Sequence, residues 1–138
     1  MRSDAGSVTL WMVGLVMVVF AVGGISIDLW RALAAHRQVA AVVDAAAVAA
    51  GSGIDEEAWR TSGVLRLDPD LVEARVEEVV AAQSPEVVSD YAVFTAEDGS
   101  SATVRAITTI DLTLLDLLVD GPLTVDAEAS VSPVVSSG

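Results

Sequence analysis

Few side chains in this sequence have the type and spacing that catalysis requires. His36 is the only histidine, and no Ser, Cys or second His stands at a useful spacing from it. A catalytic base needs a nucleophile to activate and a group that orients it. His36 is therefore better explained as a solvent-facing or capping residue. The chain has no Cys, which excludes disulfides, thiol catalysis and cysteine metal ligands.

Three groups of acidic residues could bind a metal ion, but each also suits a structural role. Asp68-x-Asp70 has ligand-like spacing, but Asp68 directly precedes a proline, as a helix N-cap often does. Asp98-Gly99-Ser100-Ser101 has the composition of a turn and lacks the spacing of a calcium loop. Asp55-Glu56-Glu57 would place negative charge at the start of a helix. Without a phosphate-binding loop, nucleophile elbow or zinc signature, we expect no enzymatic activity, cofactor or metal.

The strongest feature of the sequence is a run of twenty uncharged residues at positions 8–27. A bilayer core of about 30 Å needs about 20 apolar residues at helical rise. A signal peptide has a shorter apolar region, a basic stretch before it and a small-x-small cleavage site after it. Here only Arg2 and the amino terminus are positive, and Asp28-Leu29-Trp30-Arg31 follows. We therefore expect an uncleaved transmembrane helix with the lipid bilayer as its partner.

The charges that flank this run do not decide its orientation. Arg2 lies on one side and Arg31 and Arg37 on the other, so the positive-inside rule gives no clear answer. The short N-terminal segment and the acidic C-terminal region favour a cytoplasmic N-terminus and an extracytoplasmic domain. The expected location is the cell membrane, with a single pass.

Residues 28–50 continue the same helix, because they are rich in Ala and contain neither Gly nor Pro. From residue 8 to residue 50 the helix would be about 65 Å long. Asp28 and Arg31 are one turn apart and can pair at the edge of the hydrocarbon. Gly23-Gly24 is a soft point or a close-packing site, and Gly51-Ser52-Gly53 ends the helix.

A stripe of small and medium side chains follows this second half of the helix. Its members, spaced three or four residues apart over most of its length, are Leu29, Leu33, Ala40, Val43 and Ala47. The stripe either covers the protein's own sheet or forms a bundle with neighbouring subunits. The sequence leaves both interpretations open.

The net charge of −13 belongs wholly to residues 51–138, which contain 4 Arg against 17 Asp and Glu. There is no Lys in the chain. Nucleic acids and anionic lipid surfaces attract positive charge, so this domain does not suit either as a partner. It suits a solvated outer face or a basic protein partner.

The same region predicts an α+β fold. The expected elements are a strand at 64–67, a helix at 69–82, strands at 91–96 and 102–112 joined by a hairpin at 97–100, a helical turn at 113–118 and a strand at 123–131. The last strand alternates between apolar and polar residues, which predicts an antiparallel sheet with one covered face. The helix at 69–82, the Ala-rich helix, or both would cover it.

The chain is thus divided into five segments. They are a short N-terminal segment (1–7), a transmembrane helix (8–27), its Ala-rich extension (28–50), an acidic extracytoplasmic α+β domain (51–132) and a flexible tail (133–138).

The N-terminal third also resembles a known family. Ala5-Gly6-Ser7-Val8, the apolar span, Gly24-Ile25-Ser26-Ile27-Asp28, Arg31 and Val43-Asp44-Ala45-Ala46-Ala47 occur in the order found in TadE/TadG-like Flp (Tad) pilus-assembly proteins. Their pattern is approximately RG, an apolar run, GxxxD, R and an AADAAA-like segment. The resemblance covers about residues 2–50, and the strand in GPLTVDAEAS is similar to short, actinobacterial-type members.

This resemblance implies a membrane-anchored minor pilin or pseudopilin of a type IV-like pilus or secretion apparatus, with other pilus subunits and Tad assembly proteins as partners. The family positions in the helix are Gly24, Asp28, Arg31 and Asp44. The implied fold is pilin-like: a long N-terminal helix, a small antiparallel sheet and one further helix. The alternatives are a membrane-resident assembly factor, or a membrane-tethered binding or sensory module unrelated to pili.

The resemblance leaves N-terminal processing open. Processed pilin-like relatives have a Gly before the cleavage point and a Glu five residues after that Gly. Gly6 and Ser7 fit the cleavage point, but Trp11 occupies the position of the Glu. Cleavage after Gly6 and an intact anchor are therefore both compatible with the sequence. Incorporation of the protein into a surface pilus is also compatible with it.

Overall fold

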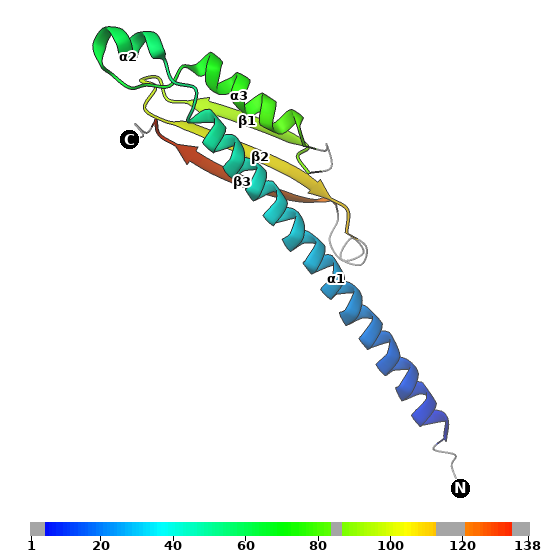
Figure 1. Ribbon diagram of the computed structural model, residues 1–138. Helices are drawn as coiled ribbons and strands as arrows, with labels where there is room; N and C mark the ends of the chain where they lie inside the picture. Colours follow the sequence, from blue (N-terminus) through cyan, green and yellow to red (C-terminus); the bar gives the residue numbers. More distant parts are fainter. Residues whose placement is uncertain (1–4, 84–86, 113–120, 134–138) are drawn as a thin grey trace.

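The computed structural model describes residues 5–83, 87–112 and 121–133. Figure 1 shows a long helix, α1 (Ala5–Ala50), whose C-terminal part lies against a small sheet and whose N-terminal part extends away from it. The helix predicted over residues 8–50 is confirmed. It is continuous through Gly23-Gly24, and it ends at the predicted Gly51-Ser52-Gly53 turn, where the N–H of Gly53 donates to the carbonyl of Ala50 (2.9 Å).

Two shorter helices follow α1. The helix α2 (Glu56–Ser62) begins after Asp55, where the acidic run predicted a helix start. The helix α3 (Pro69–Ala81) has Asp68 as its N-cap and Pro69 in its first turn, as predicted, and ends one residue before the expected boundary. The fold therefore contains a short helix, α2, in addition to the one expected after the long helix.

The strand predicted at residues 64–67 is wrong. Only Leu67 forms a bridge, an isolated antiparallel one with Ile54. The backbone groups of this segment are bonded to loops instead, because Asp55 N–H donates to the Arg66 carbonyl (2.9 Å) and Leu67 N–H donates to the Gly99 carbonyl (2.9 Å). Satisfying backbone groups in this way removes the need for a neighbouring strand.

The described strands form one antiparallel sheet in the order β1-β2-β3. They are β1 (Asp90–Thr95), β2 (Ala102–Ile110) and β3 (Leu123–Val131), with Val93, Val104 and Ala129 in register across the sheet. These strands and the hairpin between β1 and β2 confirm the sequence prediction. The helical turn expected at 113–118 lies outside the described residues, as does the expected tail beyond Pro133.

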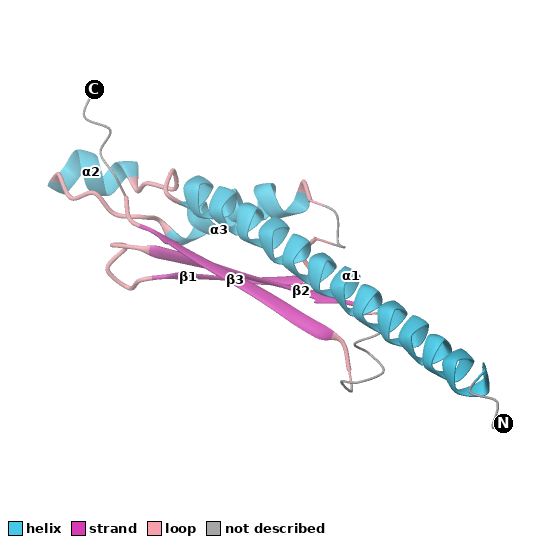
Figure 2. Ribbon diagram, turned by 90° about the horizontal axis from the view of Figure 1, so that it is seen from below, coloured by secondary structure: helices cyan, strands magenta, loops and turns pink. Residues whose placement is uncertain are grey.

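Both helices predicted to cover the sheet do so, on a single face (Figure 2). Helix α1 crosses β2 and β3, and α3 lies beside α1 and against β1. The buried core consists almost entirely of Val and Ala, with these members: Val39, Val42, Val43, Ala46, Ala47 and Ala50 from α1, Val72 and Val76 from α3, Ala102, Val104 and Ala106 from β2, and Leu67 and Val88. Small side chains let the helix approach the sheet closely.

Candidate functional site

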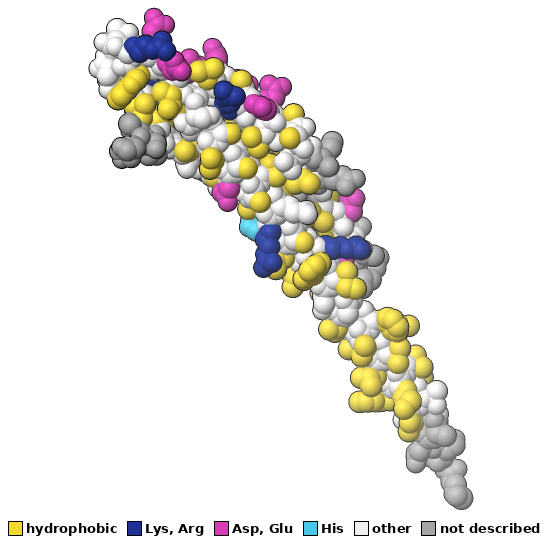
Figure 3. Space-filling model, viewed as in Figure 1, with side chains coloured by type: hydrophobic (Ala, Val, Ile, Leu, Met, Phe, Trp, Pro, Cys, Tyr) yellow, Lys and Arg dark blue, Asp and Glu magenta, His cyan; other side chains and the backbone are white. Residues whose placement is uncertain are grey.

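The N-terminal half of α1 is apolar on every side and is exposed. Figure 3 shows hydrophobic side chains along the visible face of this half, and large apolar residues from Val8 to Ile27 are exposed around the helix. The helix is long and apolar enough to cross a membrane: its most apolar 18 residues have a mean hydropathy of 2.4, and none of them is buried against the rest of the described chain. A helix that is hydrophobic all round is normally surrounded by lipid or by other helices.

A shallow hollow marks this exposed half at Gly14. The hollow has a volume of about 430 Å³ and is lined by Ser7, Leu10, Trp11, Gly14, Leu15 and Val18. A Cβ atom added at Gly14 or Gly23 would meet nothing within 4 Å in the described chain. The described chain therefore gives no packing reason for these two glycines, although small residues in apolar helices commonly allow other helices to approach.

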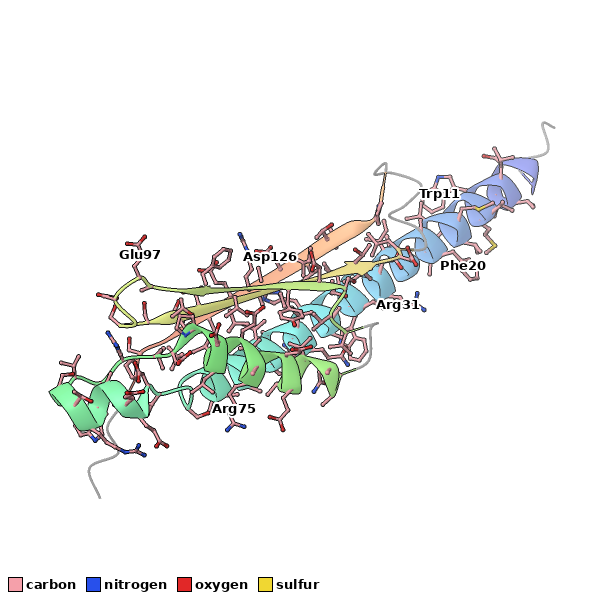
Figure 4. The ribbon with its side chains drawn as sticks, turned by 90° about the horizontal axis from the view of Figure 1, so that it is seen from above. Trp11, Phe20, Arg31, Arg75, Glu97 and Asp126 are labelled. Carbon is pink, nitrogen blue, oxygen red and sulfur yellow. The ribbon has the colours of Figure 1, made fainter. Side chains whose placement is uncertain are left out.

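The residues of the possible processing site lie in the first turns of α1. Gly6 and Ser7 are exposed and helical, and the side chain of Trp11 is 75% exposed. In Figure 4, Trp11 and Phe20 project from the helix well away from the sheet. These residues make no buried contact with the rest of the described chain, and processing stays a prediction.

Asp28 is the first buried residue of α1. Its side chain is only 1% exposed, whereas Gly24 is half-buried and Arg31 is exposed. A buried carboxylate is stable only when it has polar partners, and both Asp28 and Arg31 have interaction partners. The pairing predicted between these two residues stays a prediction. Burial of Asp28 within the fold is a feature that the sequence analysis missed.

The signal for this burial is present in the sequence. Asp28, Ala32, Ala35 and Val39 follow one another at intervals of three or four residues and are all buried or half-buried. The predicted stripe is correct at Val43 and Ala47, but Leu29 and Leu33 are exposed. The second half of the stripe therefore covers the protein's own sheet. The stripe residues that are buried there are small, whereas its large residues are exposed. Asp44 and His36 are exposed on other faces of α1.

The acidic groups considered as metal sites have structural roles. The N–H of Ala58 donates to Oδ1 of Asp55 (2.9 Å), and Nε of Arg66 donates to Oδ2 (3.0 Å). The bond from Ala58, with Arg66 as the lesser contributor, lowers the pKa of Asp55 below its ordinary value. Asp68 accepts hydrogen bonds from the N–H groups of Asp70 (2.9 Å) and Leu71 (3.3 Å).

The third group is the turn between β1 and β2. Asp98 accepts bonds from the side chain and the N–H of Ser100, which lower the pKa of its carboxyl. Across residues 5–83, 87–112 and 121–133, no three His, Asp or Glu side chains are grouped as a metal ion would require.

Comparison with known protein families gives a match to the long helix α1. Residues 6–53 match the model of the family described as putative Flp pilus-assembly TadE/G-like. This is a TadE/G-like segment. It comprises nearly all of α1 and the turn after it, and it spans Gly24, Asp28, Arg31 and Asp44, the residues on which the resemblance was based. The resemblance inferred from these residues is confirmed.

The TadE/G-like segment contains both the exposed apolar half-helix and the core residues that α1 contributes. The three strands, α2 and α3 lie beyond the matched residues. No curated protein and no solved structure matches the chain. The support that this match gives for a role in pilus assembly therefore rests on α1.

Proposed function

We propose that this protein is a membrane-anchored structural component of a Tad/Flp, type IV-like pilus assembly or secretion apparatus, similar to a minor pilin or pseudopilin. The observation that carries the proposal is the two-part character of α1. Its first half is apolar and exposed all round, and its second half forms the core beneath the sheet. The TadE/G-like match spans both halves.

Each part of the chain has a role in this proposal. Residues 8–27 anchor the subunit in the membrane, or contact the apolar helices of other subunits. Residues 28–50 connect this anchor to the sheet without a linker. The acidic domain is displayed on the extracytoplasmic side, where it initiates, caps or connects the assembly. The role is non-enzymatic, and the acidic residues considered above stabilise helix starts and turns.

A deletion strain tests the role in pilus assembly. Surface filaments are sheared from the deletion strain, from the parent and from a strain complemented with the wild-type gene, and are then quantified. A tagged copy is followed through membrane, filament and soluble fractions. We expect fewer filaments in the deletion strain and co-isolation of the tagged protein with Tad components.

Normal filaments, together with a protein that stays in the membrane without Tad components, would favour a tethered binding or sensory module. Sequencing the mature N-terminus decides the processing question separately. A start at Ser7 indicates cleavage after Gly6, and a start at Met1 or Arg2 indicates an intact anchor. A protein found in the membrane but never in filaments would be an assembly factor rather than a minor pilin.

A further inference from the structure

The strand β3 forms an open edge of the sheet. All nine of its residues are in register with β2, and no described strand pairs with its other side. The opposite edge strand, β1, has α3 alongside it (Figure 1). The β3 sequence contains neither Pro nor Lys, which commonly protect an exposed edge against pairing. An edge of this kind presents backbone donors and acceptors to an additional strand.

The two faces of β3 differ in a way that specifies such a strand. On the helix side, Val125, Ala127, Ala129 and Val131 are only half-buried, so part of their apolar surface stays open at the edge. The side chains on the other face are exposed and include two carboxylates: Thr124, Asp126, Glu128 and Ser130. An added strand would cover the first set with small apolar side chains and face the second set with polar ones.

The strand on the other side of β3 already shows how a basic side chain meets these carboxylates. Arg105 of β2 lies opposite Glu128, and its guanidinium is 3.4 Å from Oδ2 of Asp126 and 3.9 Å from Oε2 of Glu128. Beside it is a hollow of about 480 Å³ in which Ile107 is flanked across the strands by Asp90 and Asp126. A Lys or Arg on an added strand would reach the carboxylates from the opposite side.

A second copy of the chain does not fit this edge. Two β3 strands related by a twofold axis would pair antiparallel, with both helix layers on the same face. Every register that joins seven or more of the nine residues then sets Asp126 opposite Asp126 or Glu128, or Glu128 opposite Glu128. Like charges directly opposite each other destabilise a strand pair. The net charge of −13 adds a general repulsion between copies.

We propose that the β3 edge binds an extended segment of a partner protein as a fourth strand of the sheet. The segment alternates small apolar residues, which face α1, with Lys or Arg residues, which face Asp126 and Glu128. Backbone hydrogen bonds to β3 provide the pairing, and the two carboxylates select a basic partner. This surface lies outside the TadE/G-like segment and does not depend on the role of that segment in a pilus.

Binding of a defined peptide to the full chain, purified in an uncharged detergent, tests this proposal. The probe is a short labelled peptide in which Val and Lys alternate. One control has the same composition with all Val residues before all Lys residues. The other is the alternating peptide with its edge-facing nitrogens methylated, which removes backbone pairing. Affinity is measured by fluorescence anisotropy, and hydrogen exchange locates the bound peptide.

We expect the alternating peptide to slow exchange in β3 and to bind about tenfold more tightly than either control. The double variant Asp126→Asn, Glu128→Gln should lose about tenfold in affinity. The matched variant Glu77→Gln, Glu97→Gln changes the net charge by the same amount, but on α3 and in the hairpin. Its affinity for the peptide should fall less than about twofold.

Three results would overturn the proposal. Binding of both control peptides as tightly as the alternating peptide would mean that only net charge is recognised. Unchanged exchange in β3 would place the peptide elsewhere. A dimer of the wild-type chain in light scattering, with β3 protected in the absence of peptide, would identify a second copy as the occupant.

Discussion

Asp28 lies on the same stripe of α1 as Val39, about three helical turns before it, and both side chains are buried. Ala32 and Ala35 lie between them and are half-buried. The face of α1 that contacts the rest of the protein therefore begins with a carboxylate. A carboxylate is retained in a protein interior only with polar partners, and Asp28 has such an interaction.

Replacing Asp28 should destabilise the domain. Asp28→Ala removes the interaction that the buried carboxylate makes, which should lower the free energy of unfolding by about 1–3 kcal/mol. Asp44→Ala removes an exposed acid from the same helix and should change it by less than about 0.5 kcal/mol. Urea unfolding of the full chain in detergent, followed by circular dichroism, measures both. Equal midpoints for the two variants would contradict the role assigned to Asp28.

The covered face of α1 can be tested with two valines of the same helix. Val43 is 1% exposed and Val48 is 76% exposed. Val43→Ala removes two buried methyl groups and should cost about 2 kcal/mol of unfolding free energy. Val48→Ala should be neutral or slightly stabilising, because Ala has the higher helix propensity. Thermal unfolding of the two variants checks this, and a larger loss at Val48 would show that α1 is rotated relative to the sheet.

Gly99 in the β1–β2 turn should tolerate no side chain. Its φ is +67°, and an added Cβ would lie 2.8 Å from both the Arg66 Cβ and the Leu67 carbonyl oxygen. Gly99→Ala should therefore cost about 2–4 kcal/mol, from backbone strain and the displaced contact together. Gly63 has almost the same φ, +66°, with nothing within 4 Å of its added Cβ in the described chain. Gly63→Ala should cost about 1 kcal/mol. Denaturant unfolding measures the loss of unfolding free energy in each variant. The difference between the two losses is the cost of the close contact at Gly99.

Stability should depend on Asp55 in a defined direction with pH. The N–H of Ala58 and, to a lesser degree, Arg66 hold the pKa of Asp55 below its ordinary value of 3.8. A carboxyl with a depressed folded-state pKa adds stability above its unfolded pKa and loses it as the pH falls through the folded-state pKa. Asp55→Ala should therefore be less stable than wild type at neutral pH. The difference in stability should shrink as the pH falls through the folded-state pKa of Asp55.

Asp55→Asn separates the two contributions to this effect. It keeps a side-chain oxygen for the Ala58 N–H but removes the charge that faces Arg66. The free energy of unfolding of Asp55→Asn, measured at several pH values, should therefore lie between those of wild type and Asp55→Ala. A wild-type advantage that grows in acid would reverse the predicted sign.

Local patterns were sufficient to predict most of the elements. The absence of Gly and Pro over residues 28–50 predicted the continuous helix, and Asp68 with Pro69 predicted the start of α3. Alternation along residues 123–131 predicted β3 and its covered face. These features depend on backbone propensity and on burial periodicity within one element, which the sequence displays directly.

The errors concern contacts between elements. Residues 64–67 have strand-like side chains, but their backbone groups bond to the segments at Asp55 and Gly99, and no local pattern contains that information. The predicted stripe begins at Leu29 and Leu33, which are exposed. The buried face of α1 instead contains Asp28 and a series of Ala and Val residues, since α1 approaches the sheet closely. The open edge of β3 likewise follows from strand order.

The unbroken course of α1 has a mechanical consequence. The helix has 46 residues and a length of about 70 Å, and it enters the core without a hinge between Ala5 and Ala50. A force applied to the sheet is therefore transmitted along the backbone hydrogen bonds of α1 to whatever surrounds its apolar half. We therefore expect a tilt or rotation of the apolar half to turn the sheet with it.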